Sequence, residues 1–114
     1  MIIRKEDMNL RVRDNIKGGK GTIEDLKILE PEMLSGRCSL CSKFFIDPGD
    51  SLGEHTHQKD AELYYVLEGE LTVVEDGAAH LLKPGDAAFA TGGVSHWVEN
   101  RSGEQAVMLG IIFE

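Results

Sequence analysis

The chain has 114 residues, of which 41% are hydrophobic and 28% are charged, and its formal net charge at pH 7 is −8. This length fits one domain, residues 1–114, and the composition is that of a globular protein rather than a disordered or fibrous one. The negative charge argues against nucleic acid and anionic membranes as partners, because binding to phosphate groups needs clustered Lys and Arg.

The chain also lacks the pattern of a membrane helix. Its longest apolar run, residues 106–113, is far shorter than the roughly 20 apolar residues that cross a bilayer. The first residues are charged where a secretory signal would be apolar. We therefore expect a cytoplasmic protein.

The first third of the chain has the least regular pattern. Residues 1–12 alternate enough to form a strand, whereas residues 22–29 fit either a helix capped by Thr22 or a strand. We favour the strand. Pro31 suits the first position of a helix, so we predict one helical turn at residues 31–34. Residues 1–36 are therefore expected to contain strands and one short helical turn.

Two cysteines with C-x-x-C spacing follow. Cys38 and Cys41 could form a redox pair or half of a zinc site. However, residues 40–46 alternate as in a strand, and two residues three apart on a strand point to opposite faces. We predict two unlinked thiols that pack as small hydrophobic side chains.

From residue 37 onward, turn signals separate short segments rich in alternating or β-branched apolar residues. Examples of these segments are residues 63–67, 71–74 and 107–113. Asp76-Gly77 predicts a two-residue hairpin between residues 71–74 and 79–82, because such a turn needs positive φ at both positions. Many short strands with tight turns are typical of a β-sandwich or a closed barrel.

Three histidines and one carboxylate in this half of the chain suggest a metal site. His55 and His57 are two residues apart, so on a strand both rings project from one face, and Glu62 can return from the next strand. His96 must come from elsewhere in the fold. Imidazole with carboxylate favours ions such as Fe, Mn, Ni, Cu or Zn over Ca or Mg. Taken singly, each of these histidines could instead be a surface residue.

The spacing of these residues is more specific than their number. Residues 49–69 read Gly49, five residues, His55-x-His57, four residues, Glu62, six residues, Gly69. Residues 85–100 read Gly85, five residues, Thr91, one residue, Gly93, two residues, His96, three residues, Asn100.

These two segments resemble the first and second motifs of the cupins, with Thr91 at a position where the family usually has Pro. The resemblance implies an all-β fold, a double-stranded β-helix or jelly-roll barrel. It also implies that one divalent transition-metal ion, Fe, Mn, Ni, Zn or Co, is bound by four ligands. They are His55, His57, Glu62 and His96. Thr91 is expected at a turn on the pocket rim, where it affects loop conformation rather than metal binding.

Strand parity extends this interpretation to neighbouring residues. If Glu62 points inward, Tyr64 does too, which makes Tyr64 the candidate catalytic residue facing a substrate; a buried structural Tyr is the alternative. His80 lies outside both motifs, and we expect it to face solvent or the rim. Asn100 is expected to stabilise a turn.

Cupins include dioxygenases, oxalate-type decarboxylases, sugar isomerases and non-catalytic binding proteins, and the fold does not decide among them. The favoured hypothesis is a metal-dependent enzyme acting on a small oxygen-rich substrate, carboxylate or sugar-like. The alternative is a small-molecule binding or sensing barrel. A homodimer is expected, because a barrel this small leaves strand edges and residues 1–12 can add a strand to a neighbour.

Overall fold

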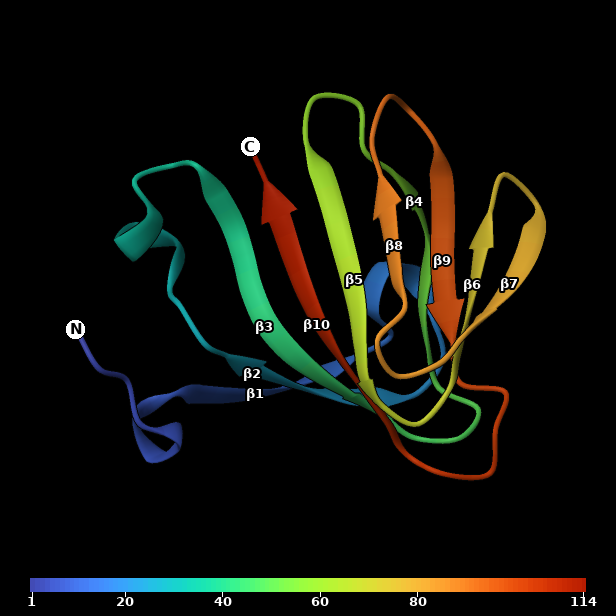
Figure 1. Cartoon of the computed structure of the whole chain (residues 1–114), viewed down its shortest axis with the longest axis horizontal. Coiled ribbons are helices and arrows are strands. Elements are labelled where there is room, and N and C mark those ends of the chain that lie inside the picture. Colours follow the sequence, from blue (N-terminus) through green and yellow to red (C-terminus); the bar gives the residue numbers. More distant parts are fainter.

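The computed structural model describes residues 1–114 and contains ten β-strands and no α-helix (Figure 1). The all-β expectation is therefore confirmed. The strands are β1 (Asn9–Asp14), β2 (Thr22–Lys27), β3 (Cys38–Ile46), β4 (Ser51–Thr56), β5 (Ala61–Glu68), β6 (Leu71–Glu75), β7 (Ala78–Leu82), β8 (Ala87–Ala90), β9 (Ser95–Glu99) and β10 (Ala106–Phe113).

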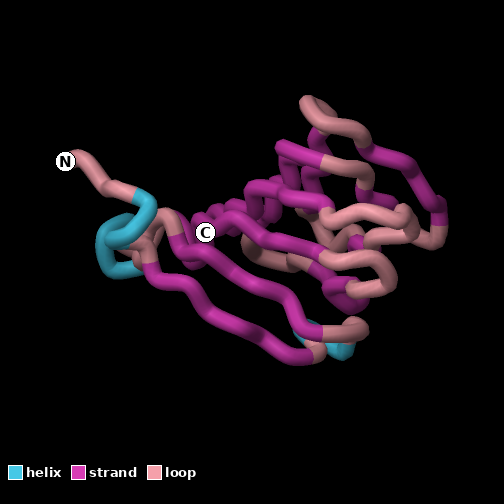
Figure 2. The backbone as a smooth tube through the Cα atoms, turned by 90° about the horizontal axis from the view of Figure 1, so that it is seen from below, coloured by secondary structure: helices cyan, strands magenta, loops and turns pink.

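Three short 3-10 helices lie in the N-terminal third. They are η1 (Lys5–Asp7), η2 (Ile16–Gly18) and η3 (Pro31–Leu34). η3 is the predicted turn at residues 31–34, and the strand interpretation of residues 22–29 is confirmed by β2. The other two turns were not predicted. Figure 2 shows the N-terminal segment extending away from the strands. None of the helices has the length and apolar character needed to span a membrane.

The strands form two sheets in which every pairing is antiparallel. One sheet has six strands in the order β1-β2-β3-β10-β5-β8, and the other has four in the order β4-β9-β6-β7. Most neighbours are distant in sequence, which is the jelly-roll arrangement. The hairpin β6–β7 has positive φ at Asp76 (46°) and Gly77 (82°), as predicted.

The register of the six-stranded sheet assigns its two faces. On one face, a row of residues runs across the sheet from β1 to β5, and each residue pairs with the next one in the row. The row consists of Arg11, Asp25, Phe44, Met108 and Val66. The last four of these are almost completely buried, with exposed fractions of 0–1%. This face is therefore the interior of the barrel, and Arg11 lies on the same face of the edge strand β1.

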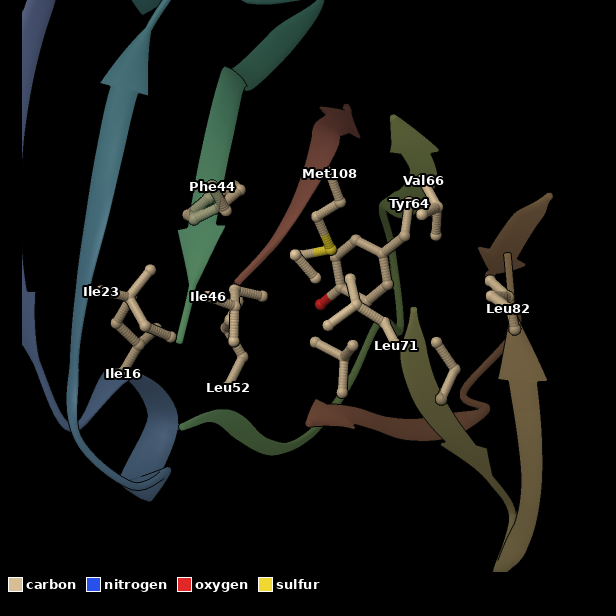
Figure 3. Packing of buried hydrophobic residues seen from close by; sticks show 13 residues of the cluster. Ile16, Ile23, Phe44, Ile46, Leu52, Tyr64, Val66, Leu71, Leu82 and Met108 are labelled. Atoms are coloured by element: carbon tan, nitrogen blue, oxygen red, sulfur yellow. The ribbon is translucent and has the colours of Figure 1, made fainter. Parts of the chain in front are cut away.

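The core is one cluster of 13 buried residues drawn from both sheets (Figure 3). Figure 3 shows the ring of Tyr64 inside this cluster, together with Phe44 and Met108. Both cysteines lie on β3, partly buried and free, as predicted. The contacts between the sheets hold in place the strand ends that carry the histidines.

Candidate metal centre

The four predicted ligands come from three strands of the two sheets and meet inside the barrel. His55 lies near the end of β4, and His57 follows one residue after that strand ends. Glu62 is the second residue of β5, and His96 is the second residue of β9. Three of the four are buried, and His55 is partly exposed. Residues 57–60 connect β4 to β5, and the sequence predicted a turn between His57 and Glu62, at residues 58–61.

A single oxygen atom lies at the centre of the cluster. Oε1 of Glu62 is 3.0 Å from Nε2 of His55, 3.0 Å from Nε2 of His57 and 3.1 Å from Nε2 of His96. The Nε2 atoms of His55 and His96 are also 3.1 Å apart. All four donor atoms lie within 4.8 Å of one another.

This donor set fits a metal ion. Two ligand atoms that are each about 2.1 Å from an ion, at right angles, lie about 3.0 Å apart, which matches the observed separations. His55 and His96 direct the same nitrogen at each other, and without a cation one of them must carry a proton for the contact to be favourable. An ion bound by all four atoms would satisfy every one of them.

The second ring nitrogen of two histidines is held by a neighbour. Nδ1 of His55 donates to the carbonyl oxygen of Gly53 at 2.7 Å. Nδ1 of His57 donates to Oδ1 of Asp60 at 2.9 Å. Such partners fix the tautomer in which Nε2 has a free lone pair for a metal. Asp60 was not singled out from the sequence, although its position two residues before Glu62 was visible.

A β-bulge aims His55 into the site. The pairing of β4 with β9 shifts between Leu52 and His55, so that two residues of β4 oppose one of β9. Leu52 and His55 therefore both face the interior although they are three residues apart. Gly53 forms part of the bulge, where a Cβ atom would lie 2.1 Å from the carbonyl oxygen of Lys17. Strand parity alone did not predict this bulge.

Tyr64 is completely buried behind the ligands. Its ring stacks on His96, with ring centres 5.0 Å apart and planes 9° from parallel. Its hydroxyl group has no hydrogen-bond partner of normal geometry. Tyr64 does not line the cavity beside the ligands. Its contact with a substrate remains a prediction, and the stacking supports a role in positioning His96.

The charges in the cluster perturb three pKa values. Burial alone would raise the pKa of Glu62, but hydrogen bonds from His55 and His96 outweigh it and hold this pKa well below its ordinary value. Burial opposes protonation of His55, but hydrogen bonds to Glu62 and Gly53 raise its pKa overall. Burial and the nearby Glu62 carboxylate raise the pKa of Tyr64. The cluster therefore carries an ionised Glu62 whose charge attracts a cation.

A cavity of about 410 Å³ opens beside the ligands. His55, His57, Glu62 and Asp60 line one part of it. A small molecule in this cavity can therefore reach the donor cluster directly. This volume falls within the range of about 300–1,000 Å³ that is usual for small-molecule sites.

Residues outside the cluster behave as the sequence predicted. His80 is exposed on β7 and contacts no ligand. Asn100 is buried and its side-chain amide donates to the carbonyl oxygens of Ile46 and Glu104, which fixes a turn. Thr91 is exposed at a turn, and its hydroxyl group lies 3.4 Å from the carbonyl oxygen of Asp60.

A sequence model of the family described as "Cupin domain" matches residues 42–112, which is more than half of the chain and includes all four ligands. The chain belongs to the cupin family. The resemblance of the two motifs is thus confirmed, and so is the fold.

Among its relatives, this cupin is 31% identical over 112 residues to the oxalate-binding protein of Thermotoga maritima, covering 98% of this chain and 93% of that protein. It is also similar to the crystal structure of a predicted oxalate decarboxylase from Thermotoga maritima, with 31% identity, a TM-score of 0.93 and coverage of 99% and 98%. A cupin 2 conserved barrel domain protein from Salinispora arenicola has 26% identity, a TM-score of 0.76 and coverage of 100% and 89%.

Proposed function

We propose that this cupin binds one divalent transition-metal ion, Fe, Mn, Ni, Zn or Co, through His55, His57, Glu62 and His96 and acts on a small carboxylate at that ion. The observation that carries this proposal is the convergence of three Nε2 atoms on Oε1 of Glu62 at 3.0–3.1 Å. An ion bound there supplies Lewis acidity toward carboxylate oxygens. Such oxygens would complete the coordination of an ion held by these four residues.

The chain's own residues divide the work at the site. Gly53 and Asp60 hold the rings of His55 and His57 in orientation, and Tyr64 packs against His96. Burial of His57, Glu62 and His96 keeps bulk water away from the inner side of the cluster. The relatives support a carboxylate as the ligand, because one is named as an oxalate-binding protein and one as a predicted oxalate decarboxylase.

Binding without turnover is the second candidate function. Decarboxylation of a carboxylate needs a proton donor for the carbon atom that loses carbon dioxide. The acidic side chains that line the cavity are Asp60 and Glu62, and both are engaged by histidine nitrogens. The engagement of both carboxylates supports binding without turnover as the second candidate, because an enzyme would need Asp60 to exchange its histidine contact for the substrate.

The test uses the purified chain loaded separately with Mn, Fe, Co, Ni or Zn. Oxalate is added, its binding is followed by calorimetry, and formate and carbon dioxide are measured. Metal-dependent release of formate supports the enzyme, and metal-dependent binding without product supports the binding protein. If oxalate and other small carboxylates bind no better with metal than without it, the proposed function is wrong.

We also propose a homodimer that forms through the outer face and free edge of the six-stranded sheet. β1 is the edge strand, and Leu10 and Val12 are 51% and 66% exposed on its outer face. Tyr65 lies on the same face, because the register runs from Leu10 across the sheet to it. An unpaired antiparallel edge is complementary to its own copy. A second copy would therefore cover apolar side chains and backbone groups together.

A further inference from the structure

Four cationic side chains gather on the wall of the cavity beside the metal ligands. The chain has 12 Lys and Arg residues against 20 Asp and Glu residues. The cations that line this cavity are Arg11, Arg13, Lys17 and Lys27. The acidic residues that line it are Asp60 and Glu62, and both contact histidines. A protein with a net charge of −8 thus has a cavity with a cationic wall.

Arg11 and Arg13 are held in place by one buried carboxylate. Asp25, on β2, is completely buried, and its Oδ2 accepts hydrogen bonds from Arg11 Nη2 at 2.5 Å and from Arg13 Nη1 at 3.2 Å. One negative charge therefore faces two positive charges. Each guanidinium group has five N–H donors, so donors remain for an anion after Asp25 is bound. Nε of Arg11 is buried without any partner.

The polarity of β1 is reversed relative to an ordinary edge strand. Arg11 and Arg13 face the interior of the barrel, whereas Leu10 and Val12 face outward. Burying part of a guanidinium group costs free energy unless its donors are satisfied. Asp25 offsets part of this cost, and both arginines line the cavity, where an anion can satisfy further donors.

Two lysines complete the wall. Lys17 belongs to η2, which packs on β4 so closely that its carbonyl oxygen occupies the space where Gly53 lacks a Cβ atom. Lys27 follows on β2, with a side chain that is 16% exposed and an Nζ atom 3.5 Å from Glu30. An anion in the cavity therefore meets cations on several sides.

Between the arginines and the metal ligands, β3 and β10 contribute an apolar stretch to the cavity wall. β2, β3 and β10 separate β1 from β5 in the sheet. Leu40 and Phe44 on β3 and Ile112 on β10 line the cavity there. The guanidinium groups of Arg11 and Arg13 reach Asp25 on β2, so three strand spacings of about 4.8 Å, roughly 14 Å along the sheet, separate them from Glu62 on β5. A ligand that reaches both the ion and the arginines must therefore be longer than oxalate and apolar in its middle.

We propose that the cavity binds an elongated dicarboxylate, with one carboxylate at the metal end and the other at Arg11 and Arg13. Its aliphatic middle lies against Leu40, Phe44 and Ile112. Binding of the first carboxylate at the metal rests on the proposed function. Binding of the second carboxylate at the arginines uses a separate site on the same cavity wall. Oxalate occupies the metal end alone.

The test compares oxalate, suberate and octanoate on the metal-loaded protein by calorimetry. Suberate and octanoate have equally long chains and differ in the distal carboxylate, so suberate should bind about tenfold more tightly. Replacing both arginines with glutamine (R11Q and R13Q) should remove that difference and leave oxalate binding unchanged. A Lys83→Gln variant removes a positive charge outside the cavity and should change nothing.

A second measurement uses only the unmodified protein, so it does not depend on whether the arginine variant folds. The affinity for suberate should fall more steeply with added salt than the affinity for octanoate, because only suberate uses the cationic wall. Equal affinities of suberate and octanoate, or an equal loss of oxalate and suberate in the arginine variant, would overturn the proposal. If instead the protein binds no metal, the proposed function fails, and weaker octanoate binding by the arginine variant than by the unmodified protein still tests the arginine end.

Discussion

His55 and His96 are separated by 41 residues in the chain, yet they are directly opposed across β4 and β9 and their Nε2 atoms lie 3.1 Å apart. Two imidazole nitrogens at this distance attract only if a proton or a metal ion lies between them. In the metal-free protein, the raised pKa of His55 favours the proton. Metal and protons therefore compete for the same nitrogen atoms.

The first prediction concerns the effect of pH on metal-dependent stability. Coordination requires neutral imidazole, so it lowers the pKa of the ligand histidines in the metal-bound protein. Groups with a lowered pKa contribute stability above their unfolded pKa, about 6.5, and lose it as pH falls. In the metal-free protein the raised pKa of His55 acts in the opposite sense: its contribution is present below about 6.5 and is lost as pH rises.

Both effects reduce the advantage of the metal-bound form on acidification. The melting temperature with metal should exceed that with chelator by about 10 °C or more at pH 8, if the ion is present at roughly a thousandfold its Kd. This gap should shrink steadily toward pH 5. Melting curves with and without chelator across this range check the prediction. A gap that stays constant or widens toward pH 5 would count against histidine ligation.

The second prediction concerns the β-bulge that orients His55. In a Gly53→Ala variant, the new methyl group would lie 2.1 Å from the carbonyl oxygen of Lys17, so η2 or β4 must shift. We expect a loss of about 1–3 kcal/mol in the free energy of unfolding and weaker metal binding, because Gly53 also accepts the hydrogen bond from His55.

Denaturant unfolding and metal titration measure these two effects. Gly103→Ala is the matched control, because a Cβ atom there meets no other atom within 4 Å. A Gly53→Ala protein as stable as this control, with unchanged metal affinity, would show that the close contact of η2 with β4 has no role in the site.

The third prediction concerns the outer face of the six-stranded sheet. The unmodified chain should be a dimer by light scattering at tens of micromolar. Val12→Glu should give a monomer, because Val12 is 66% exposed on the edge strand β1. Leu81→Glu is the control, because Leu81 is similarly exposed, at 57%, on β7 of the other sheet. A monomeric parent chain, or equal dissociation by both substitutions, would contradict dimerisation through β1.

The fold and the grouping of His55, His57 and Glu62 were predictable from local spacing, whereas His96 was assigned only through the resemblance of the second motif. The turn at Asp76 and Gly77 needs positive φ, and the separation of His57 from Glu62 matches one reversal of the chain. Both features can be recognised in a short stretch of the sequence. The same local logic predicted that Cys38 and Cys41 are not linked.

The remaining features of the site depend on contacts between distant segments. At the bulge, Gly53 of β4 lies against η2, and Gly53 is 36 positions after Lys17 in the chain. Arg11 and Arg13 looked like ordinary polar residues of an alternating strand, and only the sheet register shows that they face the interior. Tyr64 was expected to point inward; the structure shows in addition that it stacks on His96 and lies outside the cavity wall.

Metal content per chain, measured by elemental analysis after loading and removal of excess ion, tests the proposed centre most directly. The unmodified protein and the His80→Ala variant should each retain close to one transition-metal ion per chain, because His80 is exposed and contacts no ligand. The His96→Ala variant should lose most of its metal, since Nε2 of His96 lies 3.1 Å from both Glu62 Oε1 and His55 Nε2. Full metal retention in His96→Ala together with loss in His80→Ala, or no metal in any of the three, would contradict the four-ligand centre.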